Sequence, residues 1–420
     1  MTPTITGLSL WTCFGRGPDA TLEAMRTGAR YFEPITLPLV DDPWFKTKRA
    51  MQIPVPSSLR SSLTGAELPL TSFEWPMQLA VQTALDAVVD SKMLERGYPS
   101  HRIGVCNGTS HGSNHGLLEY LRQTHEGELA DPSLLADLPS IVAARIAQAI
   151  GASGPCLTFN TACSAGINAI GQAARLIESG RADCVIAGGH DTFSLLSFAG
   201  FTSLKSLDPS GARPFDVDRA GLSLGDGAAY VVLERDHEAA RRGARMRASL
   251  VGYAYLGEAY HPTAPDPEGL GIEAAMRAAL ERVERPERLA FVSAHGTGTP
   301  ANDESELRAI ARVAGSLALA EPVDVVSLKS QTGHGLGAAG AIQSVATILA
   351  MEAGIVPANV SLRAPVEHPE QVRLPTQPTR RPIPLAICNS LGFGGSVAAL
   401  ALAAPTLEAP GASTTTETSP

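Results

Sequence analysis

Residues 158–180 read TFNTACSAGINAIGQAARLIESG, which places a strand, a turn and a helix in immediate succession. The apolar start is typical of a buried strand, and the spacing of apolar residues from Ala165 onward predicts a helix that ends near Gly180. Cys163 lies where the turn meets the helix. A helix N-terminus offers unpaired N–H groups and partial positive charge, which favour a thiolate, so Cys163 is a candidate nucleophile. Taken alone, the same residue would be interpreted as a small buried apolar side chain.

A second segment repeats the pattern of this helix. Residues 339–354, AGAIQSVATILAMEAG, have the same length as residues 165–180 and share the Ala-Gly start and the Glu-x-Gly end. Each segment follows a strand-like run and a turn of small residues, and small residues on both helices would allow them to pack closely. A coincidental similarity between two Ala-rich helices is the alternative that the sequence leaves open.

The rest of the chain alternates between predicted helices and strands, which indicates an α/β architecture. Helices are predicted over residues 76–91 and 135–150, and buried strands over 102–105, 184–187, 228–233 and 385–388. We expect a division into an N-terminal half, residues 1–250, and a C-terminal half, residues 251–407. The tail over residues 408–420 is rich in Ser, Thr and Pro and almost free of apolar residues, which predicts disorder.

Two later segments each present a histidine in a loop of small residues. Residues 292–304 read VSAHGTGTPANDE and contain His295, and residues 325–340 read VVSLKSQTGHGLGAAG and contain Lys329 and His334. Lys329 follows a strand-like run, whereas His334 lies in a glycine-rich turn. A thiol nucleophile, together with two histidines that can move protons near neutral pH, is suited to acyl transfer.

With these blocks the chain resembles the β-ketoacyl-[acyl carrier protein] synthases of the thiolase-like superfamily, in particular the elongating enzymes of type II fatty acid and polyketide synthesis. The matching blocks are NTACSAG (160–166), AGG (187–189), RPFD (213–216), GDGA (225–228), AHGTGTP (294–300), KSQTGH (329–334) and NSLGFGG (389–395). They are ordered over about residues 3–405. The resemblance implies a thiolase-like α/β fold whose duplicated halves form a five-layer αβαβα sandwich, with the two repeat helices at its centre.

The resemblance also implies a reaction, the decarboxylative condensation of an enzyme-bound acyl chain with a malonyl group on acyl carrier protein. Cys163 would take up the acyl chain, and its N–H group and that of Phe393 would form the oxyanion hole. His295 and His334 would stabilise the enolate that decarboxylation leaves. The phenyl ring of Phe393 would also act as a gate.

Further residues match the supporting positions of that family. Lys329 would orient the site, with Glu306 as its carboxylate partner, since a buried ammonium needs one. Thr297 and Thr299 would bind the phosphopantetheine arm of the carrier protein. This arm belongs to the substrate, so no cofactor bound by the enzyme itself is expected.

Some positions depart from the family pattern. Asp226 replaces a usual Glu and Leu391 a usual Phe, from which we expect altered packing. His111 aligns with the residue that sets the depth of the acyl pocket, where a buried polar group would favour a polar, unsaturated or aryl-containing chain. The alternative is a slipped local alignment that leaves His111 on the surface.

The docking surface for the carrier is a further departure from the family. Residues 59–67 keep only Arg60 as a positive charge, so we expect docking on Lys46, Lys48 and Arg49 instead.

Composition limits the class of protein. The chain has 420 residues, 44% apolar content and a net charge of −9, which argues against nucleic acid as the main partner. We find no signal peptide and no apolar run long enough to span a bilayer, and we expect a soluble cytoplasmic protein. The six cysteines are scattered, which excludes a disulfide framework and a zinc or other metal site.

Two rival interpretations and the partners remain to be weighed. One rival is a non-catalytic partner subunit like the chain-length factors, which generally lack the active cysteine. The other is a thiolase, for which Cys388 would be the second cysteine. We expect acyl carrier protein as partner and either a homodimer or a heterodimer with a chain-length-factor-like subunit. His111 tilts the pathway slightly toward specialised polyketide or polyene synthesis.

Overall fold

A computed structural model describes residues 2–35, 41–69, 75–112, 115–135 and 138–405. The tail that the sequence predicts to be disordered, residues 408–420, lies outside the described residues. Helices and strands in the described part are interleaved along the chain, as the alternating pattern predicts.

The strands form two halves that share one order and one set of directions. In the N-terminal half, three parallel strands are followed by two antiparallel ones: β8 (Cys156–Phe159), β7 (Ile103–Gly108), β9 (Cys184–Asp191), β10 (Gly227–Arg235) and β1 (Pro3–Thr12). The C-terminal half repeats this with β13 (Val323–Val326), β12 (Leu289–Ser293), β17 (Leu385–Gly392), β18 (Ser396–Ala403) and β11 (Ala248–Gly257). Two residue pairs between β1 and β11 join the halves. The repeated topology confirms the predicted duplication.

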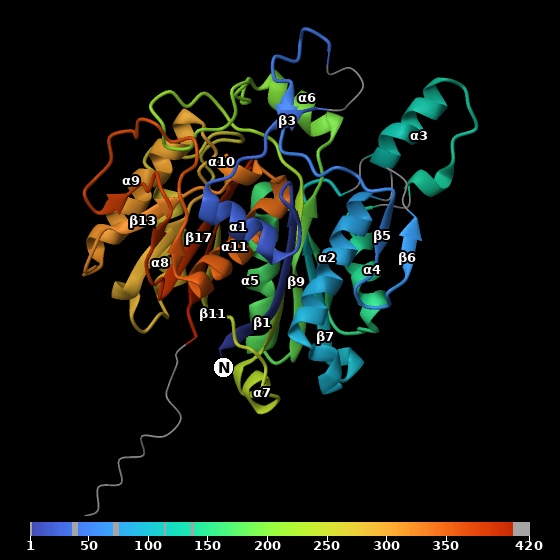
Figure 1. The fold of residues 1–420 in the computed structure, drawn as a ribbon, viewed down its shortest axis with the longest axis horizontal. Helices are drawn as coiled ribbons and strands as arrows, with labels where there is room; N and C mark the ends of the chain where they lie inside the picture. Colours follow the sequence, from blue (N-terminus) through green and yellow to red (C-terminus); the bar gives the residue numbers. More distant parts are fainter. Residues whose placement is uncertain (1, 36–40, 70–74, 113–114, 136–137, 406–420) are drawn as a thin grey trace, which may run out of the picture.

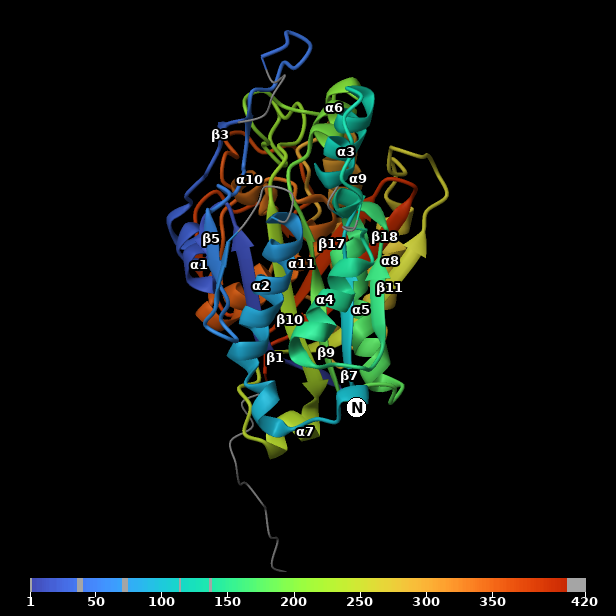
Figure 2. The same cartoon turned by 90° about the vertical axis from the view of Figure 1, so that its right-hand side faces the viewer.

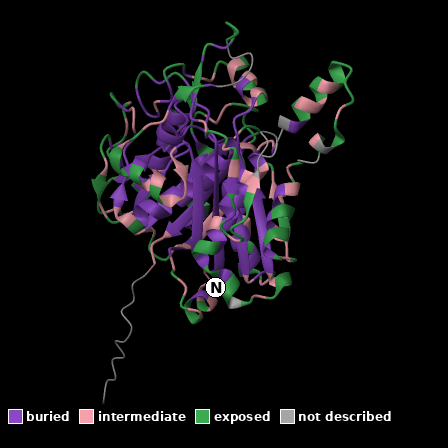
Figure 3. Ribbon diagram, turned by 45° about the vertical axis from the view of Figure 1, so that its right-hand side comes forward, coloured by how far each residue is buried: buried purple, intermediate pink, exposed green. Residues whose placement is uncertain are grey.

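Helices cover and separate the two half-sheets. The pair α5 (Ala165–Glu178) and α11 (Ala339–Ala353) lies between them, and contacts strands of both. On the outer faces lie α2 (Trp75–Ser91) and α4 (Ile141–Ile150) at one side, and α8 (Leu270–Leu280) and α9 (Pro300–Ser316) at the other. Figure 1 shows this order, and the buried residues concentrate in the strands and central helices (Figure 3). The expected five-layer sandwich is confirmed.

The two repeat helices approach closely because the second residue of each is a glycine. A Cβ on Gly166 would lie 2.7 Å from the backbone nitrogen of Ala341, and one on Gly340 would lie 2.9 Å from that of Ile167. Neither position has room for a side chain, so the Ala-Gly start of each repeat permits the central contact.

Shorter elements decorate the ends of the sandwich. These are α1 (Pro18–Thr27), α3 (His115–His125), α6 (Leu195–Ser203), α7 (Asp236–Arg241), α10 (Lys329–Thr332), β2 (Gly15–Arg16), β3 (Glu33–Pro34), β4 (Arg49–Ala50), β5 (Ser58–Arg60), β6 (Glu67–Pro69), β14 (Ile355–Val356), β15 (Val372–Arg373) and β16 (Thr379–Arg380). Of these, α6 and β3 lie at one end of the molecule, and α7 lies at the opposite end (Figures 1 and 2).

One sequence prediction about helices was wrong. The helix predicted over residues 135–150 begins only at Ile141, while Pro132–Leu135 form a separate 3₁₀ turn. Residues 336–353 are long and apolar enough to span a bilayer, but 89% of this segment is buried inside the fold, because it contains the central helix α11.

Candidate active site

Cys163 lies in a 3₁₀ turn, η4 (Ala162–Ser164), between strand β8 and helix α5. The turn is tight enough that Ala162 adopts a φ of +49°, a conformation that costs free energy in any residue but glycine. The cysteine is buried, and lines a cavity of about 240 Å³. The same cavity is lined by His295, His334, Thr297, Thr299, Leu391 and Phe393, so segments far apart in the sequence meet there.

Two opposing effects act on the thiol of Cys163. Its pKa is raised to about 12, chiefly by burial; the Lys329 ammonium lowers it, Asp191 raises it, and the backbone N–H of Cys163 lowers it. Burial therefore opposes the thiolate that the helix N-terminus favours, and the favoured thiolate stays a prediction.

His295 and His334 face each other across the cavity. Their ring centroids are 5.4 Å apart and the ring planes are nearly perpendicular, at 84°. Nδ1 of His334 accepts a hydrogen bond of 3.2 Å from the N–H of Leu336, and Nδ1 of His295 lies 3.4 Å from Nζ of Lys329. With Nδ1 accepting in both rings, the proton of each neutral imidazole belongs on Nε2.

Burial keeps these imidazoles neutral. It lowers the pKa of both histidines well below 6.5, and the positive charge of Lys329 adds to this effect. Each ring can therefore present an Nε2–H donor at neutral pH. Two such donors are suited to stabilising one developing oxyanion.

Lys329 and Glu306, which the sequence predicts to be partners, are both buried and meet at the backbone of His295. Nζ of Lys329 donates to the carbonyl oxygen of His295 and, at 3.2 Å, to Oε1 of Gln343. The Glu306 carboxylate accepts from the N–H groups of His295 and Gly296, each at 2.8 Å. Both therefore hold the backbone of the His295 loop.

Burial shifts the pKa values of this pair in opposite directions. It lowers the pKa of Lys329, which the charge of Glu306 raises in turn. It raises the pKa of Glu306, which the two backbone N–H groups and the charge of Lys329 lower. Each charge thus favours the ionised form of the other, which supports the predicted partnership, and both side chains contact the backbone of His295.

Thr297 and Thr299 lie on the loop between β12 and α9. Their Oγ1 atoms are 2.9 Å apart, and Gly298 between them has a φ of +82°, which favours glycine. Gly298 is held from both sides, since its carbonyl accepts from the N–H of Gly221 at 3.0 Å and its N–H donates to Asp303 at 3.2 Å.

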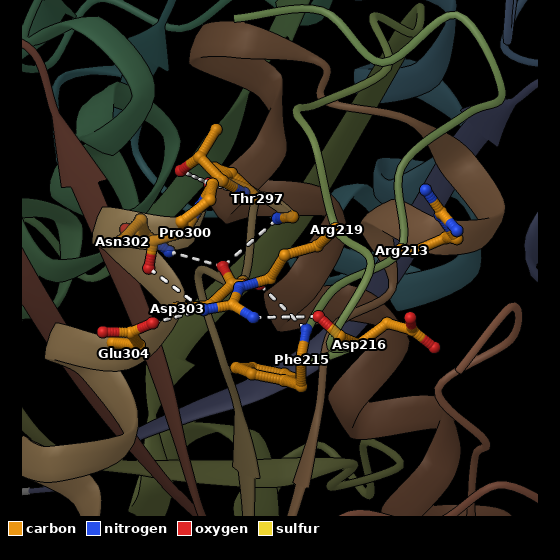
Figure 4. A network of polar contacts seen from close by, with 12 residues as sticks. Arg213, Phe215, Asp216, Arg219, Thr297, Pro300, Asn302, Asp303 and Glu304 are labelled. Atoms are coloured by element: carbon orange, nitrogen blue, oxygen red, sulfur yellow. Dashed lines mark hydrogen bonds and ion pairs between the residues drawn. The ribbon is translucent and has the colours of Figure 1, made fainter. Parts of the chain in front are cut away.

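The network behind this loop was not predicted from the sequence. Asp303 also accepts from the N–H of Phe215 at 2.8 Å, and the buried Arg219 lies 3.8 Å from it. The guanidinium donates to the carbonyl of Asp216 at 2.9 Å and to Glu304 at 2.8 Å (Figure 4). Phe215, Asp216, Asp303 and Glu304 lie within the quoted segments and Arg219 lies just beyond one of them, but only tertiary contacts bring them together.

Phe393 occupies the turn between β17 and β18, and 42% of the residue is exposed. Gly394 and Gly395 follow with φ values of +87° and +76°. The phenyl ring lies 5.8 Å from that of Phe201 on α6. A Cβ on Gly392 would lie 3.3 Å from the backbone nitrogen of Cys163, so this turn packs directly on the nucleophile's turn.

Other predicted residues lie outside the cavity lining. His111 contacts Ser197 of α6, with 2.9 Å between Nε2 and Oγ, and its Nδ1 lies 3.8 Å from Asp191. Cys388 is buried against Thr347, with its pKa raised to about 11, so it cannot act as the second cysteine of a thiolase in this cavity.

Asp226, which departs from the family pattern, and the basic residues predicted to bind the carrier protein lie elsewhere in the structure. Asp226 accepts from the N–H groups of Ile53, at 2.7 Å, and Phe193, so it ties two loops together. Lys46, Lys48 and Arg49 are exposed, as is Arg60. Among the described residues, no group of three or more His, Cys, Asp or Glu side chains is arranged to hold a metal ion.

Comparison with known proteins gives consistent matches along the chain. The model of the N-terminal domain of β-ketoacyl synthase matches residues 4–239, and that of the C-terminal domain matches residues 247–363. The chain is 38% identical to the 3-oxoacyl-[acyl-carrier-protein] synthase 2 of Synechocystis sp., over 77% of this chain and 80% of that protein. It is 33% identical to the ketoacyl synthase alpha subunit of the tetracenomycin polyketide synthase from Streptomyces glaucescens, over 96% of both chains.

Solved structures match over nearly the whole chain. The ishigamide ketosynthase/chain length factor superposes with a TM-score of 0.86 and 31% identity, over 96% of this chain and 99% of that chain. A chain from the complex of a type II polyketide acyl-carrier protein with its ketosynthase gives a TM-score of 0.85 and 27% identity, over 96% and 99% of the two chains.

Proposed function

The chain belongs to the β-ketoacyl synthase family, and we propose which of its residues carry out the reaction. It is an acyltransferase that condenses an acyl chain with a malonyl group on acyl carrier protein, which gives a β-ketoacyl carrier. The observation that supports the residue assignment most directly is that one buried thiol and two imidazoles line the same cavity. The roles below are those that the family resemblance implies, and this geometry supports them.

In the first half-reaction, Cys163 attacks the carbonyl carbon of the acyl-carrier thioester. A new C–S bond forms, the bond to the carrier's sulfur breaks, and the proton of Cys163 leaves with the carrier thiol. The N–H groups of Cys163 and Phe393 stabilise the tetrahedral oxyanion, a role that the close packing of Gly392 on Cys163 supports. Phe393, flanked by glycines, opens and closes the acyl pocket.

In the second half-reaction, the malonyl carrier loses CO2, and the resulting enolate oxygen accepts hydrogen bonds from Nε2–H of His295 and of His334. The enolate carbon then attacks the acyl thioester on Cys163. A C–C bond forms and the C–S bond breaks, so that the sulfur of Cys163 leaves as a thiolate, which takes up a proton from water. Lys329 and Glu306 hold the His295 loop in place during this step, as their backbone contacts indicate.

Thr297 and Thr299 bind the phosphopantetheine arm through their paired hydroxyls at the cavity wall. The arm arrives with the carrier, so the enzyme needs no cofactor of its own for these steps. The acidic carrier docks on the exposed cluster of Lys46, Lys48 and Arg49. We place the reaction in the cytoplasm, where carrier-bound intermediates are used.

The architecture also supports pairing with a second chain. It further supports different roles for the two halves of this chain. Leucines 117, 118 and 121 on the projecting helix α3 are exposed, as is Leu157 on β8, the last strand of its half-sheet in the described residues. An open strand edge beside apolar side chains favours pairing with another ketosynthase-fold chain, either a copy or a chain-length-factor-like subunit. Residues 1–250 would supply the nucleophile, and residues 251–407 the histidine loops.

A non-catalytic subunit is the alternative function, and an acylation assay separates the two. The intact mass of the enzyme is measured after incubation with a panel of acyl-carrier thioesters, for wild type and Cys163→Ala, and malonyl carrier is then added. We expect an acyl adduct on wild type alone, followed by an extended product. A folded wild type that no donor acylates, alone or with a chain-length-factor-like partner, would overturn the assignment.

We propose that the protein acts in specialised polyketide or polyene synthesis rather than in fatty acid synthesis, and this proposal is based on His111. Its contact with Ser197 places a polar pair beside α6, the helix that also provides Phe201 to the cavity. His111→Ile should shift the preferred acyl chain toward saturated aliphatic chains in the same assay. An unchanged preference would show that His111, which lies outside the cavity lining, does not influence the choice of acyl chain.

A further inference from the structure

Gln343 is a buried amide on the central helix α11 that the reaction described above does not use. Its residue is 2% exposed. Nε2 donates toward three backbone carbonyl oxygens, those of Ser293 at 3.3 Å, Ala294 at 2.7 Å and Asn389 at 3.3 Å. These carbonyls belong to the ends of β12 and β17, the strands that lead to His295 and to the Phe393 turn.

The other end of the same amide faces a cation. Oε1 of Gln343 accepts from Nζ of Lys329 at 3.2 Å. This ammonium also donates to the carbonyl of His295 and lies 3.4 Å from its Nδ1, so Gln343 provides the third acceptor for a group with three N–H donors. Each of the three N–H donors of the buried ammonium therefore has an acceptor.

The surroundings permit only one orientation of the amide. Turned around, the carbonyl oxygen of Gln343 would face three carbonyl oxygens, and its NH2 group would face an ammonium. No apolar side chain could satisfy either side, and a carboxylate would satisfy only the side of Lys329. The site therefore selects a neutral group with a donor on one side and an acceptor on the other.

We propose that Gln343 is a positioning residue for condensation, which fixes Lys329 against His295 and ties the His295 loop to the strand that carries Phe393. This inference rests on the proposed function of His295. The hydrogen bonds of this amide go to Lys329 and to the segments of β12 and β17, and not to the turn η4. Its loss should therefore affect the step that uses His295 Nε2–H far more than the acylation of Cys163.

The test separates the two half-reactions in Gln343→Met, a change that conserves volume and removes both hydrogen-bonding functions. Acylation of Cys163 is followed by intact mass, and the condensation of acylated enzyme with malonyl carrier is followed in a single turnover. We expect condensation to slow by about tenfold to a hundredfold, as for a misplaced catalytic group. Acylation should stay within about threefold of wild type, which also shows that the variant is folded.

The pH profile gives a readout that a purely structural role would not move. Lys329 is faced by Glu306 and Asp303 of α9, by Cys163, and by the rings of His295 and His334, none of which the variant changes. Loss of an acceptor destabilises the ammonium, so the alkaline limit of condensation should move to lower pH in Gln343→Met. In Gln343→Glu a carboxylate replaces the acceptor, and the limit should move to higher pH.

Thr347→Val is the matched control, because Thr347 lies one turn further along α11, is equally buried and contacts Cys388 rather than Lys329. It should leave both half-reactions and the pH limit unchanged. Condensation in Gln343→Met at the wild-type rate would overturn the inference. So would a fall of both half-reactions by the same factor with an unmoved alkaline limit. Failure of the wild type to acylate would instead contradict the proposed function.

Discussion

Two helix N-termini meet at the centre of the molecule, and only one of them carries a cysteine, the proposed nucleophile. Before α5 lies the turn η4, and before α11 lies an equivalent 3₁₀ turn, η6 (Leu336–Ala338). The duplication extends to the strained residue, since φ is +49° at Ala162 and +48° at Leu336. At the next position the halves diverge, because one has Cys163 and the other has Gly337.

The difference between the turns lies in what fills the space beside them. The N–H of Gly337 donates to Oδ2 of Asp191, the last residue of β9, at 2.7 Å. The equivalent last residue of β17 is Gly392, which has no side chain to place beside the N–H of Cys163. One turn is thus closed by a carboxylate, and the other is left open for the oxygen of a substrate. The shared backbone does not make a turn catalytic; the residue at the end of the third parallel strand does.

The largest effect should come from closing the open turn with a methyl group. In Gly392→Ala, the new Cβ would lie 2.9 Å from the carbonyl oxygen of Thr161 and 3.3 Å from the nitrogen of Cys163. We expect acylation to slow by about 10²-fold to 10³-fold, as when an oxyanion donor is lost. The rate is measured by the appearance of the acyl-enzyme mass.

Gly337→Ala provides the comparison at the closed turn. Its Cβ would lie 2.5 Å from the nitrogen of Ser110 and 2.7 Å from Oδ2 of Asp191, so the protein should lose stability rather than chemistry. Equal rates of acylation in wild type and Gly392→Ala would show that the space beside Cys163 is not where the oxyanion lies.

The next effect concerns the carboxylate that closes the second turn. Asp191 accepts from Oγ1 of Thr109 at 2.6 Å and from the N–H groups of Ser110 and Gly337 at 2.8 Å and 2.7 Å. Asp191→Asn would turn an NH2 group toward donors, and should lower the free energy of unfolding by about 1–3 kcal/mol. Urea denaturation measures this. If acylation instead fell as far as in Gly392→Ala at unchanged stability, the two turns would not differ in role.

The sequence predicted this architecture because its signals are local. The Ala-Gly starts of the two repeat segments predict close packing, and the glycines at 166 and 340 are where the helices touch. The loop residues around His295 and His334 likewise carry their own turn signals. A local sequence pattern was sufficient to predict the structure wherever a residue acts through its own backbone conformation.

The features that the sequence did not predict depend on tertiary contacts, which leave no pattern in a short stretch of sequence. Asp191 closes a turn that lies far along the chain, and Gln343 bridges three segments, so neither has a spacing to detect. The burial of Cys163, which opposes the thiolate that the helix N-terminus favours, is likewise a property of the assembled fold. The contacts of Lys329 and Glu306 with the backbone of His295 also depend on tertiary structure.

The smallest expected effect is that of pH on condensation. It tests whether His295 and His334, beside the open turn, are shielded from water and uncharged. Burial and the charge of Lys329 hold the pKa of His295 and of His334 well below 6.5, the value at which an ordinary histidine is half protonated. A proton added at Nδ1 would also face the Leu336 N–H or the Lys329 ammonium. Condensation at saturating substrate should therefore change by less than about twofold between about pH 7.5 and 6.5. A loss of half the rate centred at the ordinary histidine pKa would mean that the imidazoles are solvated, and that burial does not distinguish the open turn from the closed one.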